Sequence, residues 1–555
     1  MPVAVVTATA AAVGWRTLRV PGTRRGIGRA PVVFPTMRTW AGGPRAGWAR
    51  AGGLHPGPGT GPLRRGLLGG IGLPGAGRGG GFSRAHGAGE AEPARWATRR
   101  DVRALVVDAP RAGRLSLGTA RGRLLAAERG HSVLVVGPTQ SRKTSGFAVP
   151  AILEWQGPVV AASVKSDLAR HTLTWRRRQG RVWVYDPCAS TGLDCASWSP
   201  LQSSRTWEGA RRTAASLTEV ARSSGSLTDG DFWYATAAKL LAPLLLAAAS
   251  SGGTMADVVR WVDVQEVEEV FDVLSAAGAR HALQAMQAAW GRDERQRSAV
   301  FTTAETVVEV FADPAVAASE AAASSADFED RIDPVRLLDG NDTLYLCAPT
   351  HDQRRLRPLF ATLVTQVVEA AYERAARRGE PLDPPVLVVL DEAANVAPLA
   401  ELDVLASTAA GHGVQLVTVW QDLAQLQARY GTRAGSVVNN HRVKVFLSGI
   451  ADPGTLDHAS TLIGETELRS WTTTVDGSGA TSLTDSPSLR RLAPADSLRR
   501  IPPGDAVVVS GHLAPIRLRL RPWQGDRSLR ARAEAGLDAP VSRWSPRRPM
   551  GTVGP

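Results

Sequence analysis

The segment HSVLVVGPTQSRKTSGF, residues 131–147, contains the pattern that best predicts the fold. Its run from Val133 to Val136 is short, apolar and β-branched, which predicts a buried strand of a parallel sheet. Gly137 ends the run, and Lys143 and Thr144 follow shortly before a stretch that can be helical. A strand, a tight loop and a helix start, with Lys-Thr at the end of the loop, is the layout of a phosphate-binding loop.

The predicted loop supplies the groups that an anion needs. Backbone N–H groups and the helix N-terminus face the phosphates, Lys143 adds a point charge, and the hydroxyl of Thr144 holds Mg²⁺. We therefore predict a site for ATP and Mg²⁺. Its nucleotide-binding residues are Gly137, Pro138, Thr139, Gln140, Ser141, Arg142, Lys143, Thr144 and Ser145.

One residue departs from the pattern Gly-x-x-x-x-Gly-Lys-[Ser/Thr]. Arg142 stands where the second Gly belongs, and a Cβ at this point crowds the approach of the backbone to a phosphate. Three alternatives follow. The Arg142 side chain reaches the phosphates as a cation, or it fills the pocket and prevents hydrolysis, or the stretch is a strand, turn and helix with a chance Lys-Thr.

A second apolar strand ends in two acidic residues. In PPVLVVLDEAANV, residues 384–396, the run from Val386 to Leu390 delivers Asp391 and Glu392 to its carboxyl end. Such a pair completes a nucleotide site, because the Asp carboxylate orders Mg²⁺ and the Glu polarises the attacking water. We predict Asp391 and Thr144 as metal ligands and Glu392 as a catalytic residue.

A further strand is predicted in GVQLVTVWQDLAQL, residues 413–426, and it ends at Gln421. A polar residue at this position lies beside the phosphates in such sheets, so Gln421 is predicted to sense the γ-phosphate. The alternative is that Gln421 caps the following helix.

The remaining segments predict an α/β protein with a mainly parallel sheet. Apolar runs at 158–164, 181–187, 343–349 and 437–450 are predicted strands, and helix-length connections between strands favour parallel pairing. Hairpins are predicted at 115–128 and 506–523, and in the second the alternating Arg517, Arg519 and Arg521 should share one exposed face. Residues 200–335 have helical periodicity.

Charge and composition separate the N-terminal segment from the rest. Residues 1–100 hold fifteen Arg and two acidic residues, which is the whole net charge of +13. This segment could contact nucleic acid or anionic lipid, or be a solvated tail. Three cysteines in 555 residues fit a reducing compartment. No run of 18 apolar residues occurs, so no membrane-spanning helix is predicted.

The order of the motifs resembles that of the type IV secretion coupling proteins, the TraG/TraD-like DNA-transfer ATPases of conjugation. The matching pieces, within roughly residues 96–523, are GPTQSRKTS, VKSDL, GDFWYATAAKLLAPLL, TLYLCAPTHDQ, VLVVLDEAANV, GVQLVTVWQDLAQLQARYG, VVNNHRVKVFLSG and RRLAPADSLRRIPPGDAVVVSG.

The resemblance implies a RecA/FtsK-like P-loop motor with an inserted all-helical domain. The expected division is a disordered segment 1–94, a motor domain 95–200 and 336–525, a helical domain 201–335 and a flexible tail 526–555. It also implies a homo-hexamer at the cytoplasmic face of the cell membrane. Such a motor couples ATP hydrolysis to moving single-stranded DNA, or a relaxase–DNA complex, into a type IV secretion channel.

Three departures from the family pattern separate two functional hypotheses. Arg142 replaces the loop Gly, no N-terminal membrane helix is predicted, and STAAGHG before the Gln421 strand has no Arg to act on a neighbouring subunit's ATP. Arg429 and Arg442 are the candidates for that role. The first hypothesis is a DNA-transfer ATPase, and the alternative is a nucleotide-binding, non-hydrolysing adaptor that recruits secretion substrates. A chromosome-pumping septal translocase shares the core but fits the helical insertion and the late motifs less well.

Overall fold

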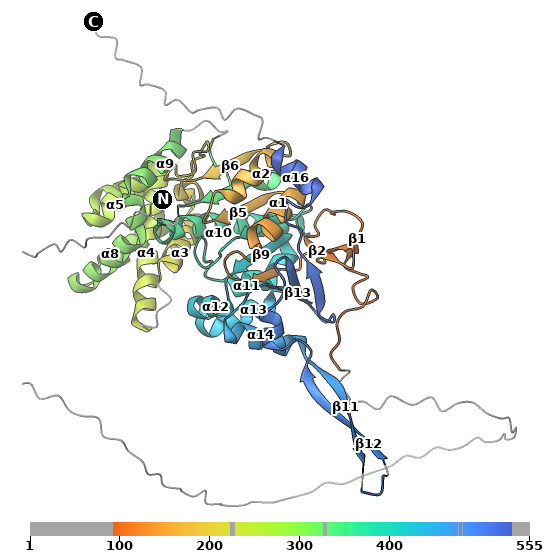
Figure 1. Cartoon of the computed structure of the whole chain (residues 1–555). Coiled ribbons are helices and arrows are strands. Elements are labelled where there is room, and N and C mark those ends of the chain that lie inside the picture. The colour runs from red at the N-terminus through yellow and green to blue at the C-terminus, as the bar shows by residue number, and fades with distance from the viewer. Residues whose placement is uncertain are drawn as a thin grey trace, which may run out of the picture. The chain divides into compact units, whose positions relative to one another are not determined.

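A twelve-stranded sheet runs through the protein, for which a computed structural model describes residues 93–222, 228–325, 330–349, 351–475, 477–479 and 481–535 (Figure 1). The strands, in spatial order, are β1 Val106–Val107, β3 Arg123–Ala126, β2 Ser116–Ala120, β14 Ile516–Arg519, β13 Asp505–Ser510, β10 Val443–Leu447, β4 Val133–Val136, β9 Val414–Trp420, β8 Val386–Leu390, β5 Val159–Ser163, β7 Thr343–Cys347 and β6 Val182–Tyr185.

The central strands are parallel, as the apolar runs predict. Every pair from β10 through β4, β9, β8, β5 and β7 to β6 is parallel, and the pairs from β10 to β1 are antiparallel. The side chains of β4 alternate between two cores, because Val133 and Val135 enter one and Leu134 and Val136 the other. The predicted α/β fold with a mainly parallel sheet is confirmed.

Helices connect the strands and cover both faces of the sheet. Gly379, in a left-handed conformation with φ 74°, ends the longest of them, as expected for a helix C-terminus. These helices are α1 Val149–Glu154, α2 Asp167–Arg177, α10 Gln353–Arg378, α11 Leu402–Thr408, α12 Leu423–Tyr430, α13 Ala434–Asn440, α14 Pro453–Ile463, α15 Ala495–Arg499 and α16 Arg527–Glu534.

The stretch between β6 and β7 is helical, as its periodicity predicts. Its helices are α3 Trp207–Ala221, α4 Thr228–Ser251, α5 Met255–Asp263, α6 Glu268–Ala276, α7 Arg280–Trp290, α8 Glu294–Val308 and α9 Pro314–Ser325. Within α4, residues 231–251 have the length and composition of a membrane span, although 61% of that window is buried against the protein's own helices. No other described helix meets both criteria.

Two C-terminal predictions are wrong in part. Arg517 and Arg519 are exposed on β14, but Arg521 lies beyond the strand and pairs with Glu154 at 2.7 Å and Asp526 at 2.8 Å. Arg521 therefore does not share their exposed face. The predicted tail 526–555 begins with α16, because Asp526 caps the helix and Leu529 is buried. The rest of that tail, from residue 536, lies outside the described residues, as does most of the predicted disordered segment 1–94.

A long two-stranded ribbon was not predicted. β11 Glu465–Val475 pairs with β12 Thr481–Arg491 in an antiparallel register, and nearly every side chain of both strands is exposed. Opposite residues share a face, so Trp471, Val475, Leu483 and Leu489 lie on one side of the ribbon. The other side carries mostly serine and threonine. Neither face of the ribbon is buried, so its strands lack the alternation of apolar and polar residues by which a strand is predicted from sequence.

Candidate nucleotide site

The predicted loop follows β4 at the carboxyl edge of the parallel strands. The Gly137 N–H donates to the carbonyl of Trp420 at 3.0 Å, which ties the loop to the end of β9. A Cβ on Gly137 would lie 2.6 Å from Ser141 Oγ and 2.8 Å from Leu447 Cβ. Both distances are shorter than van der Waals contact, so this position requires glycine for lack of space.

The position of Arg142 has the backbone conformation that favours glycine. Its φ is 68°, and Gln140 two residues earlier has a φ of 65°. Both are left-handed, which an L-residue adopts at a cost of roughly 1–2 kcal/mol. The exposed Arg142 side chain lies beside Gly504, where an added Cβ would be 3.4 Å from a guanidinium nitrogen. The guanidinium is thus directed to the β13 side of the loop, away from Lys143 and Asp391.

Lys143 is buried inside the loop. Its Nζ donates to the carbonyls of Gly137 at 2.6 Å and Pro138 at 3.0 Å. Burial lowers the pKa of the Lys143 ammonium, and the nearby carboxylates of Asp391 and Glu392 oppose this shift. The two carbonyls hold the ammonium where incoming phosphate oxygens could replace them as partners.

Asp391 and Thr144 meet although 247 residues separate them. The Thr144 hydroxyl donates to Asp391 Oδ2 at 2.8 Å, and the Ser163 hydroxyl at the end of β5 lies 3.4 Å from the same oxygen. No motif in the sequence marked Ser163 as a residue of the site. Asp391 is fully buried and its Oδ1 has no hydrogen-bond partner within the described structure. Burial raises the pKa of the Asp391 carboxyl, partly opposed by its bond from Thr144.

These oxygens fit a magnesium ion. A free carboxylate oxygen beside a hydroxyl supplies the hard oxygen ligands that Mg²⁺ prefers, and Mg²⁺ commonly takes one or two protein carboxylates with phosphate and water. No group of three or more His, Cys, Asp or Glu residues that could hold a metal occurs in the described ranges. An ion here would therefore depend on the nucleotide for part of its coordination.

Glu392, two residues beyond the end of β8, adopts a strained conformation with φ 63°. Its Oε2 accepts a hydrogen bond from Asn395 Nδ2 at 3.2 Å. Arg357 of α10 donates to the Asn395 carbonyl at 2.9 Å and to Asn395 Oδ1 at 3.3 Å. Arg357 and Asn395 thus orient the Glu392 carboxylate. Sequence reasoning missed both residues, and nothing in the pattern around Arg357 could have identified it.

Gln421 follows β9 directly, next to the residue that binds the Gly137 N–H. Asp422 caps α12 by accepting from the backbone N–H of Gln425 at 2.8 Å. The alternative that Gln421 caps the following helix is therefore wrong. Its side chain makes no hydrogen bond in the part of the chain that the structure describes, which leaves its amide available at the loop.

The two arginines predicted to act between subunits lie in different settings. Arg429 is partly buried in its own chain and donates to the Pro398 carbonyl at 3.4 Å. Arg442 is exposed beside Gly511, at the end of β13. Burial, with the positive charge of Arg429 nearby, lowers the pKa of Arg357, so Arg429 lies near the group that orients Glu392. The role between subunits stays a prediction for both.

Comparisons with known proteins give one consistent result. The family model for type IV secretory system conjugative DNA transfer matches residues 89–535. Conjugal transfer protein TraG of Escherichia coli is 26% identical over 382 residues, which cover 63% of this chain and 58% of that protein. Protein VirD4 of Agrobacterium fabrum (strain C58 / ATCC 33970) is 26% identical over 434 residues, 74% of this chain and 61% of that protein. The chain thus spans about three-fifths of the length of these relatives.

Solved structures share the fold. The unbound bacterial conjugative coupling protein TrwBdeltaN70 superposes with a TM-score of 0.60 at 18% identity, over 77% of this chain and 92% of that one. Plasmid coupling protein TrwB in complex with ADP and Mg²⁺ gives a TM-score of 0.60 at 18% identity, over 78% and 94%. At this identity the likeness shows the fold alone.

Proposed function

The chain belongs to the type IV secretory system conjugative DNA transfer family, and from this premise we propose that it is an ATP-dependent coupling protein. Its substrate is single-stranded DNA or a relaxase–DNA complex, which it recruits and pumps toward a type IV secretion channel. We place it as a homo-hexamer at the cytoplasmic face of the cell membrane. The relatives' names support conjugal transfer, and the complexes of TrwB with ADP and Mg²⁺ and with an ATP analogue support the cofactors.

One observation carries the proposal. The hydroxyl of Thr144 and the carboxylate of Asp391 meet at 2.8 Å, and Asp391 keeps a buried oxygen with no partner. An unpaired buried carboxylate oxygen is costly unless a ligand satisfies it. Bound Mg²⁺ would supply the positive charge that satisfies this oxygen. Bound ATP would supply the terminal phosphoryl group that passes to water, with ADP as the leaving group.

The surrounding residues take the following roles. Lys143 exchanges the carbonyls of Gly137 and Pro138 for phosphate oxygens, and the backbone N–H groups of the loop bind the same anion. Glu392, oriented by Asn395, accepts a hydrogen bond from water and draws its proton. Gln421 donates its amide toward the terminal phosphate.

A second candidate is a nucleotide-binding adaptor that recruits substrates without hydrolysis. Two observations favour it. Arg142 places a side chain at a left-handed backbone position that favours glycine. The Lys143 ammonium already donates hydrogen bonds to two carbonyls of the loop. The direction of the Arg142 side chain, beside Gly504, favours the motor instead, because the guanidinium leaves the phosphate side of the loop open.

ATP turnover by the full chain, with and without single-stranded DNA, separates the two candidates. Lys143→Ala and Arg142→Gly variants are measured in parallel. The motor requires that the native chain turns over ATP and that Lys143→Ala does not. If only Arg142→Gly turns over, the native chain is a disabled motor and the adaptor function holds. The hexamer is tested separately, by the mass of the particle in solution with nucleotide present.

A further inference from the structure

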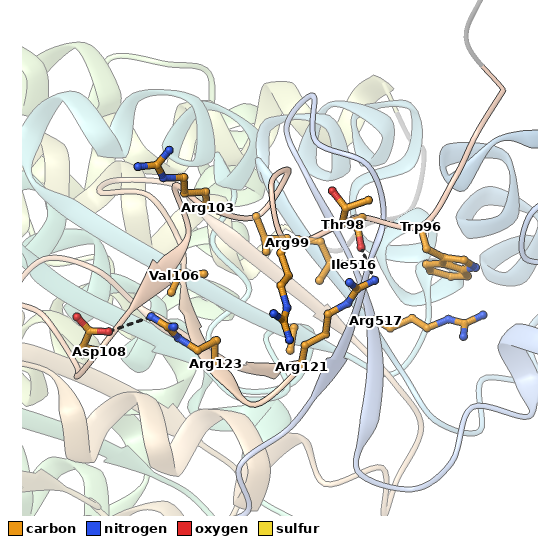
Figure 2. Close-up of a pocket in the computed structure, with 13 residues that line it drawn as sticks. Trp96, Thr98, Arg99, Arg103, Val106, Asp108, Arg121, Arg123, Ile516 and Arg517 are labelled. Carbon is orange, nitrogen blue, oxygen red and sulfur yellow. Dashed lines mark hydrogen bonds and ion pairs between the residues drawn. The ribbon is translucent and has the colours of Figure 1, made fainter.

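A basic cavity opens at the antiparallel edge of the sheet, apart from the nucleotide site. Its volume is about 860 Å³, and it lies between residues 96–108, the turn joining β2 to β3, and β14. Figure 2 shows the side chains that line it. Five arginines and a single acidic residue, Asp108, are among them. The arginines are Arg99, Arg103, Arg121, Arg123 and Arg517.

Most of this positive charge has no counter-charge. Asp108 pairs with Arg123 at 3.1 Å, and Arg121 donates to the Ala97 carbonyl at 3.3 Å. Neither the Arg99 nor the Arg103 guanidinium makes a hydrogen bond or ion pair with any residue that the structure describes. Arginines that outnumber the acidic residues of a concave site attract a polyanion, because the low-dielectric walls focus their field.

An aromatic ring adjoins the arginines. The Arg517 guanidinium lies 4.3 Å from the centre of the Trp96 ring, which is only partly buried. Figure 2 shows Trp96 and Arg517 at one end of the cavity and Arg103 pointing away at the other. A partly exposed indole beside guanidinium groups suits a ligand that combines flat rings with phosphates.

Two further cavities extend the basic surface to the phosphate loop. A neighbouring cavity of about 590 Å³ shares Trp96, Arg121 and Arg517 with the first and adds Arg519. A third, of about 620 Å³, contains Arg519 again together with Arg142. We call the surface formed by Arg99, Arg121, Arg517, Arg519 and Arg142 the basic tract. Arg142 thus belongs to a surface outside the phosphate site.

We propose that the basic tract binds the phosphodiester backbone of single-stranded nucleic acid, with Trp96 as a stacking surface for a base. The identity of the polyanion rests on the proposed function, but the binding does not require hydrolysis. The recessed shape favours a flexible strand over a membrane, because the phosphates of a bilayer lie in a plane. Through Arg142 the tract touches the loop itself, so that strand occupancy and nucleotide state can influence one another.

The test compares two variants of the full chain. R99Q/R121Q/R517Q removes three tract charges, and R211Q/R295Q/R378Q removes three exposed arginines from α3, α8 and α10 as a matched control. Binding of a labelled oligothymidylate is measured by fluorescence anisotropy, without nucleotide, over a range of salt concentrations. For single strands each phosphate contact contributes about 0.7 to the slope of log affinity against log salt. Loss of three contacts should therefore lower the slope by about 2, and the affinity by about tenfold or more at low salt.

The salt slope matters because residues 1–92 hold twelve further arginines, which are the same in all variants. The proposal holds if the tract variant loses slope and the control variant keeps it. It is overturned if both bind like the native chain, or if the tract variant loses only its binding to anionic phospholipid vesicles. A chain that binds strands through the tract but never turns over ATP would disprove the motor and leave this inference standing.

Discussion

At the scale of single residues, two positions of the phosphate loop are restricted for different physical reasons. Position 137 requires glycine because a Cβ has no space there. The second glycine position of the pattern requires a left-handed φ, which Arg142 adopts. The sequence was sufficient to bring Thr144 and Asp391 together, because carboxyl ends of parallel strands meet at one edge. It could not predict the direction of the Arg142 side chain, which depends on Gly504, a residue far away in the chain.

Gly137→Ala should weaken nucleotide binding by about tenfold or more, because the added Cβ clashes with Ser141 and Leu447 and displaces the loop. The affinity for a fluorescent ATP analogue measures this loss. Gly435→Ala is the control, since a Cβ there meets nothing within 4 Å. Equal affinity of both variants would contradict the loop geometry described for Gly137.

Arg357→Ala should lower the turnover number on the order of 10- to 100-fold and leave the affinity for ATP unchanged. Arg357 touches the site only through Asn395, which orients Glu392, so it acts as a positioning residue. Steady-state kinetics separates the turnover number from KM. Arg354→Ala, an exposed neighbour on the same helix, should behave as the native chain. A rise in KM with unchanged turnover would argue against this role.

At the scale of elements, the strands that could be predicted are those buried in the sheet. β4 and β8 are apolar at every position, and β5 is apolar at every position before its last residue, Ser163, so their composition alone marks them. The ribbon β11–β12 and the helix α16 escaped prediction for a common reason. The ribbon has no side that faces the core, and the helix buries only Leu529 and Ala533 among many polar residues.

A buried hydrogen-bond chain joins β9 to α13. Trp420 Nε1 donates to Thr418 Oγ1 at 2.9 Å, the Thr418 hydroxyl lies 3.0 Å from His441 Nε2, and His441 Nδ1 lies 2.7 Å from the Val437 carbonyl. The Val437 carbonyl can only accept, so Nδ1 carries a proton, and in the neutral ring Nε2 accepts a hydrogen bond from the Thr418 hydroxyl. Burial lowers the pKa of His441 to about 4.

Stability should therefore fall as the pH is lowered from about 6.5 toward 4. In this window the unfolded His441 takes up a proton and the folded one does not, so protonation lowers the free energy of the unfolded state relative to the folded state. The loss from this residue is about 2 kcal/mol at pH 5. Thermal unfolding at pH 7.5 and pH 5 measures it, and His441→Gln should be less stable at pH 7.5 with a smaller pH dependence. An unchanged pH dependence in the variant would contradict the assignment.

At the scale of the whole molecule, the phosphate loop and the acidic pair belong to chain segments separated by seven helices, α3 to α9. The sheet brings them together, since β4 and β8, which lead to the loop and to the acidic pair, are separated by β9 alone. The organisation as a motor domain with an inserted helical domain stays a prediction. It could be proposed from sequence because the change from strand period to helix period is sharp near residue 200, but period alone does not establish independent folding.

Replacing residues 468–488 by a short glycine–serine turn should leave the thermal midpoint within about 1 °C of the native value. The removed part of the ribbon buries almost nothing, and the contact at its base, from the Leu492 N–H to the Gly464 carbonyl at 3.0 Å, is kept. Differential scanning calorimetry and the affinity for ATP check the result. A drop of several degrees would show that the ribbon supports the sheet.

Because the ribbon is exposed on both faces, its length can change during evolution without disturbing the core. Adding two residues to each strand would move the tip by about 7 Å and keep every side chain on its side. Adding one residue to each strand below Trp471 would turn that side chain, and everything beyond it, to the serine–threonine face. Homologous ribbons of different length should therefore differ by even numbers of residues per strand, if selection keeps Trp471, Val475, Leu483 and Leu489 on one side.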